Sequence, residues 1–196
     1  MANETFARGA ERPGKTLSYS KEPLFDSQTK RWQDSALIAA VRNRSVESAL
    51  MAIGKGASID TKDMSGSTAL MTAAESGDAA MCKALLDKGA DIEARMLNSD
   101  IGLGTCETAL MAAAKHGKKD VCILLLEKGA DPNAKDRYKT TALMYAAQFG
   151  YPDVCRSLLE HGADPRLKDV NLMTALQLSS NGASDEIQKY LAHFKV

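Results

Sequence analysis

Long hydrophobic runs and an excess of charge are both missing from this 196-residue sequence. No stretch of about 18 consecutive apolar residues occurs, so we expect no transmembrane helix and no membrane insertion. The 25 basic residues are balanced by 25 acidic ones, whereas a dedicated nucleic-acid-binding protein is usually basic. The N-terminus also lacks the apolar core of a secretory signal. We therefore expect a cytoplasmic protein that binds no nucleic acid, with the cytoskeleton, the cilium and the nucleus as alternative locations.

Cysteine and histidine are scarce, with four and three residues respectively. No CxxC or HxxxH spacing occurs, so we expect no metal site and no cofactor. Cys82, Cys122 and Cys155 each precede a Gly-Ala pair by seven residues, which makes them one core position seen three times. We expect them to be free, buried thiols of the kind found in reducing compartments. No Ser, His and Asp residues suggest a catalytic set, so we expect no enzymatic activity.

The sequence does contain two short motifs that recur together. Thr-Ala-Leu begins at residues 68, 108, 141 and 174, in steps of 33, 40 and 33 residues. Gly-Ala begins at residues 56, 89, 129 and 162. A fixed period of this size predicts stacked supersecondary units. Within one unit, Thr141 is placed to cap a short alanine-faced helix that Gly150 ends, and Pro152 begins a second helix before a turn-rich loop.

These recurring motifs resemble the ankyrin repeat. The best copy matches that family's pattern at Thr141, Leu143, Ala146, Ala147, Gly150, Val154, Leu158, Leu159, Gly162, Ala163 and Asp164. Methionine replaces the family's histidine at positions 71, 111 and 144, where we expect it to fill the space by packing. The resemblance implies an all-α solenoid of about five helix-turn-helix repeats with hairpin loops. We place the repeats at approximately residues 34–66, 67–99, 100–139, 140–172 and 173–196, and each hairpin is numbered with the helix pair that follows it.

Residues 1–33 precede the repeats and show no helical periodicity, so we expect a polar, extended N-terminal arm. It is either a flexible tail or a segment that threads into a neighbouring subunit. Residues 9–16, GAERPGKT, match the phosphate-loop pattern GxxxxGK[ST]. That chemistry requires a buried strand before the loop and a long helix after it. Neither is apparent, so nucleotide binding is only a weak alternative function.

The resemblance implies a protein-binding scaffold without catalysis, and the candidate contacts lie in variable loop and first-helix positions. Repeat three carries seven extra residues between 95 and 107, and insertions in solenoids often lie on the binding face. The candidate protein-binding residues are Arg137, Tyr138, Thr140, Gln148, Phe149, Lys115, His116, Met96, Leu97, Ile101 and Leu103. Glu107 is grouped with them as a variable position. Two roles stay open: a fixed subunit of a cytoskeletal, ciliary or similar assembly, and a free regulatory adaptor or inhibitor.

Overall fold

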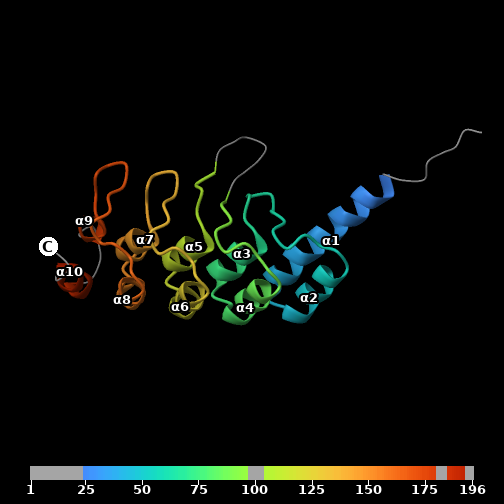
Figure 1. The fold of residues 1–196 in the computed structure, drawn as a ribbon, viewed down its shortest axis with the longest axis horizontal. Coiled ribbons are helices and arrows are strands. Elements are labelled where there is room, and N and C mark those ends of the chain that lie inside the picture. Colours follow the sequence, from blue (N-terminus) through green and yellow to red (C-terminus); the bar gives the residue numbers. More distant parts are fainter. Residues whose placement is uncertain (1–23, 97–103, 180–184, 193–196) are drawn as a thin grey trace, which may run out of the picture.

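The described part of the chain forms an elongated stack of five helix pairs, with hairpin loops projecting from one side (Figure 1). The computed structural model describes residues 24–96, 104–179 and 185–192. The helices are α1 (Leu24–Arg42), α2 (Val46–Gly54), α3 (Ala69–Ser76), α4 (Ala79–Asp87), α5 (Ala109–Lys115), α6 (Lys119–Glu127), α7 (Ala142–Gln148), α8 (Pro152–Glu160), α9 (Ala175–Ser179) and α10 (Asp185–Ala192). The odd-numbered helices form an inner row and the even-numbered helices an outer row. The predicted all-α repeat solenoid is confirmed.

Threonine caps set the start of the inner helices. The hydroxyls of Thr68, Thr108 and Thr141 each accept a hydrogen bond from the backbone N–H three residues later. Each donor belongs to the methionine that replaces the family's histidine, and all three methionine side chains are buried. The methionine side chains therefore fill the histidine position by packing, as expected.

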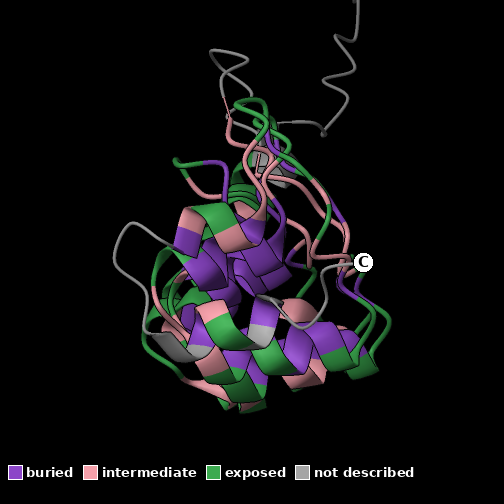
Figure 2. Cartoon of the chain, turned by 90° about the vertical axis from the view of Figure 1, so that its left-hand side faces the viewer, coloured by how far each residue is buried: buried purple, intermediate pink, exposed green. Residues whose placement is uncertain are grey.

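Buried residues line the space between the two helix rows (Figure 2). The inner row contributes alanines, which allow the helices to approach closely, and the outer row contributes larger side chains such as Leu85, Leu125 and Leu158. Cys82, Cys122 and Cys155 are free and lie in this core, as the repeated spacing predicts. Burial raises the pKa of each of the three thiols to about 12.

Three of the described hairpins turn on an aspartate. Asp63, Asp136 and Asp169 are the first residues of their turns, and one carboxylate oxygen of each accepts hydrogen bonds from the backbone N–H groups two and four residues later. Burial acts to raise the pKa of Asp63, but hydrogen bonds from Ser65 and Ser67 hold it below its usual range. In repeat three, Met96 replaces the aspartate and pairs through its backbone N–H with the carbonyl of Glu107 at 2.9 Å.

Neighbouring repeats are also tied through their loops. The backbone N–H of Arg137 donates to the carbonyl of Thr105, and that of Val170 donates to the carbonyl of Tyr138, both at 2.9 Å. Side chains add a second row of ties, since Asn133 accepts from the N–H of Asp164 at 2.7 Å. The hairpins are thereby held in a fixed order along the stack.

The predicted boundary of the N-terminal arm is wrong. Residues 24–33 are not extended: they form the first half of α1, which projects beyond the stack (Figure 1). Asp34, where the repeats were expected to begin, lies inside α1 and accepts a hydrogen bond from the N–H of Ser58 at 2.7 Å. Residues 1–23, including the phosphate-loop match, lie outside the described residues.

Candidate protein-binding face

The tip of the hairpin in repeat four, residues 136–140, carries the predicted contacts Arg137, Tyr138 and Thr140. The Asp136 carboxylate holds the backbone of Tyr138 and Thr140 at 2.8 and 2.7 Å, so the turn is fixed from the inside. The side chain of Tyr138 is 51% exposed and that of Arg137 is also exposed. The expected exposure of Tyr138 is confirmed, whereas its role in binding stays a prediction.

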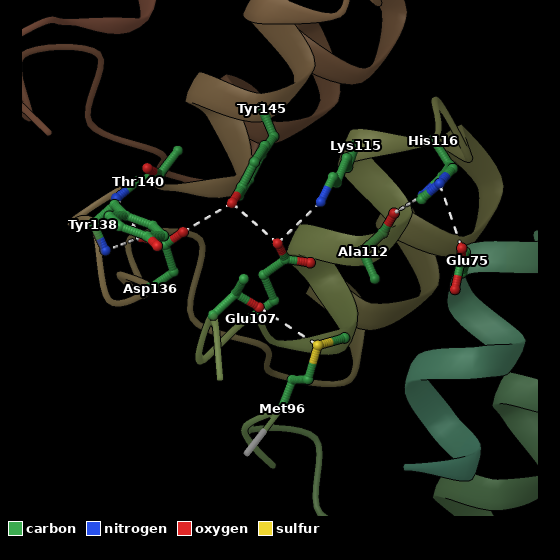
Figure 3. A network of polar contacts seen from close by, with 11 residues as sticks. Glu75, Met96, Glu107, Ala112, Lys115, His116, Asp136, Tyr138, Thr140 and Tyr145 are labelled. Atoms are coloured by element: carbon green, nitrogen blue, oxygen red, sulfur yellow. Dashed lines mark hydrogen bonds and ion pairs between the residues drawn. The ribbon is translucent and has the colours of Figure 1, made fainter. Parts of the chain in front are cut away.

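The far ends of the inner helices present a second group of predicted contacts. Phe149 caps the C-terminus of α7 and is 48% exposed, and the neighbouring Gln148 is exposed as well. His116 takes the same place after α5 (Figure 3). Its Nδ1 lies 3.0 Å from the carbonyl of Ala112, and its Nε2 lies 3.5 Å from a carboxylate oxygen of Glu75 on α3. These helix ends form an exposed row along the stack.

Lys115 and Glu107 belong to a polar network between repeats three and four (Figure 3). The Lys115 ammonium lies 3.1 Å from Glu107 and 5.3 Å from the centre of the Tyr145 ring. The Tyr145 hydroxyl lies 2.8 Å from Asp136 and 3.1 Å from Glu107. Burial, with both carboxylates nearby, holds the pKa of Tyr145 above its usual range.

This network corrects the interpretation of Glu107 as a surface position, because its side chain is buried. The physical reason is that Tyr145 and Lys115 together satisfy the buried carboxylate. Lys115 is half-buried and ion-paired. It is a less available contact than its neighbour His116.

The insertion in repeat three is described only at its base. Met96 is partly buried against the core, and its sulfur lies 3.5 Å from the hydroxyl of Thr105. Leu97, Ile101 and Leu103 lie outside the described residues. Among the residues that are described, no three His, Cys, Asp or Glu side chains gather where they could hold a metal ion. Across those same ranges, no helix is long and apolar enough to cross a membrane.

A family model for ankyrin repeats, three copies long, matches residues 15–96 and 95–169. The chain belongs to the ankyrin-repeat family. Ankyrin repeats are generally protein-interaction modules and non-catalytic scaffolds. No curated protein matches the chain. The match begins at residue 15, within the segment that the sequence alone assigned to an arm, in keeping with the early start of α1.

Sequence reasoning missed two features of this ankyrin-repeat protein. The first is the Tyr145 network, for which the signal was a tyrosine where other repeats have Thr72, Ala112 and Leu178. The second is the exposure of Val170 and Leu172 at the tip of the last hairpin, residues 169–173. Aligning the hairpins on their aspartates gives Val170 the position of Arg137, a predicted surface residue, and gives Leu172 the position of Lys139.

Proposed function

We propose that this protein is a non-catalytic scaffold that binds a partner protein through its hairpin tips and the exposed ends of its inner helices. One observation carries the proposal. Seven large hydrophobic side chains are exposed in the described part of the chain, and five of them lie on these two features: Met64, Tyr138, Phe149, Val170 and Leu172. Exposed apolar groups that lie close together are typical of protein-binding surfaces, and the tips that carry Tyr138 and Val170 are hydrogen-bonded to one another.

We further propose that the protein works as a fixed subunit of a larger assembly, such as a cytoskeletal or ciliary complex. The support for this role comes from α1 and α2, at the N-terminal end of the stack. Trp32 on α1 is 77% exposed, and Met51 on α2 is exposed as well. The first half of α1 extends past the neighbouring helices (Figure 1). A neighbouring subunit could cover this surface, and the segment before α1 could thread into it.

A free regulatory adaptor or inhibitor is the alternative role, because the same hairpin surface would also suit reversible docking. For the location we propose the cytoplasm, with the cytoskeleton, the cilium and the nucleus as alternatives. The three free, buried thiols support a reducing compartment.

Site-specific photo-crosslinking in the native cell tests the binding surface. A benzophenone amino acid is placed at Tyr138 or Phe149, and the matched control places it at Lys83, an exposed residue of the outer helix α4. We expect the same partner to be crosslinked from both test positions and not from the control. Equal crosslinking from all three positions, or none from the first two, would contradict the proposed surface.

Fractionation of the same cells by size separates the two roles. A fixed subunit elutes at the high mass of its assembly even when diluted, and its crosslinked partner elutes with it. An adaptor elutes near the mass of the 21.0 kDa chain and meets its partner only in some fractions.

A further inference from the structure

The tips of the last two hairpins, residues 136–140 and 169–173, form one continuous surface that we call the paired tips. The N–H of Val170 donates to the carbonyl of Tyr138 at 2.9 Å, which fixes one tip against the other. Together they expose Tyr138, Val170 and Leu172, three of the seven large exposed hydrophobic side chains in the described residues.

The exposed charge around the paired tips has a single sign. Over residues 135–140 and 168–173 the cations are Lys135, Arg137, Lys139 and Lys168, and all four are exposed. The two acids in these segments, Asp136 and Asp169, are buried and accept backbone hydrogen bonds. Lys135 lies near Asp164, which also pairs with Arg166. Within the described part of the chain, neither Arg137 nor Lys139 forms an ion pair.

The two tips share an unusual backbone conformation at one position. The fourth turn residue adopts a positive φ in both tips, +59° at Lys139 and +62° at Leu172. Repeat two has glycine at the same position, Gly66, with a φ of +83°. Glycine is the residue that tolerates this conformation without strain. Leu172 is nevertheless 71% exposed, so packing within the fold does not offset the strain.

We propose that the paired tips bind an extended, acidic segment of the partner protein that also carries large apolar side chains. Its carboxylates would pair with Arg137, Lys139 and the flanking lysines, and its apolar side chains would cover Tyr138, Val170 and Leu172. The proposal rests on the protein-binding function above and adds the chemistry of the partner. A nucleic acid would match the positive charge but would leave the aliphatic side chains of Val170 and Leu172 uncovered.

A random library of 12-residue peptides, selected against the full chain, tests this inference. The test variant is Lys139→Gly with Leu172→Gly, which removes both side chains and relieves the backbone strain, so its melting temperature should not fall. The control variant is Lys83→Ala, which truncates an exposed side chain on the outer helix α4. Affinities of the selected peptides are measured by fluorescence polarisation at low and high salt.

We expect the selected peptides to be acidic and to contain leucine, phenylalanine or similar residues. The glycine variant should bind them at least about ten-fold more weakly, as truncation of a binding hot spot does, and the control should bind normally. Affinity should fall as salt is raised. Selected peptides without acidic bias, undiminished binding by the glycine variant, failure to select any peptide, or tighter binding of a single-stranded oligonucleotide would each overturn the inference. The proposed function would still stand if Tyr138 and Phe149 crosslinked a partner protein.

Discussion

Tyr145 joins repeat four to repeat three through side-chain polar contacts. Its hydroxyl lies within hydrogen-bonding distance of two buried carboxylates, and it can donate its single proton to only one of them at a time. The shorter contact, 2.8 Å, is to Asp136, which also orders the hairpin tip. A side chain buried in the stack therefore supports the exposed residues of the hairpin tip.

Replacing Tyr145 with phenylalanine is expected to destabilise the fold by about 1–3 kcal/mol, the cost of leaving a buried polar group without its hydrogen bond. Chemical denaturation of the two proteins measures the difference. The matched control is Tyr138→Phe, which removes an exposed hydroxyl and should change the free energy of unfolding by less than about 0.5 kcal/mol. Equal effects for the two variants would show that the network adds no stability.

The three core cysteines give a prediction about reactivity with thiol reagents. Burial raises the pKa of Cys82, Cys122 and Cys155 to about 12, so at pH 8 only on the order of one in ten thousand of each is a thiolate. A thiol reagent added to native protein at pH 8 should modify Cys106 first, because it is only partly buried. The other three should react on unfolding. Rapid reaction of four thiols in the native state would contradict this.

Among the elements, the turns at the C-terminal ends of the helices differ in how closely the next repeat approaches. Gly117 has a φ of +67°, and a Cβ added there would lie 2.6 Å from the ring of Tyr151 in repeat four. Gly89 has a φ of +89°, and a Cβ there would meet nothing within 4 Å. Both positions require a left-handed backbone, but only at Gly117 would an added side chain also collide with the neighbouring repeat.

Gly117→Ala should therefore destabilise the protein more than Gly89→Ala does, by about 1–3 kcal/mol, the usual cost of overpacking. Thermal unfolding of both variants gives the comparison, and Gly89→Ala serves as the control for backbone strain alone. If the two variants melt alike, the contact between Gly117 and Tyr151 has no energetic weight.

An element could be predicted from the sequence when the residues that specify it lie close together in the chain or recur at a fixed spacing. The threonine caps and the buried cysteines repeat at fixed spacing, so the sequence predicts them. The first half of α1 was missed because it lies outside the period and its residues show no regular apolar stripe. Glu107 was misplaced because the insertion before it obscured its partners, and the contact with Tyr145 spans 38 residues. The exposure of Tyr138 and Phe149 was predicted correctly, because the equivalent positions in the other repeats hold unlike residues.

At the scale of the whole molecule, stability passes from one repeat to the next, since each helix pair packs on its neighbours. Leu125 is fully buried in α6, between α4 and α8. Leu125→Ala should cost about 2–5 kcal/mol, and hydrogen exchange should become faster in repeats two and four as well as in repeat three. Loosening confined to repeat three would mean that the repeats unfold independently.

The central claim is that the hairpin tips and the inner helix ends bind a partner protein. The double variant Tyr138→Ala, Phe149→Ala tests it most directly, with partner capture and melting temperature measured on the same preparation. Both side chains are about half exposed, so the account predicts that capture is lost while the melting temperature is unchanged. Full capture by the variant, or a collapsed melting curve, would contradict it.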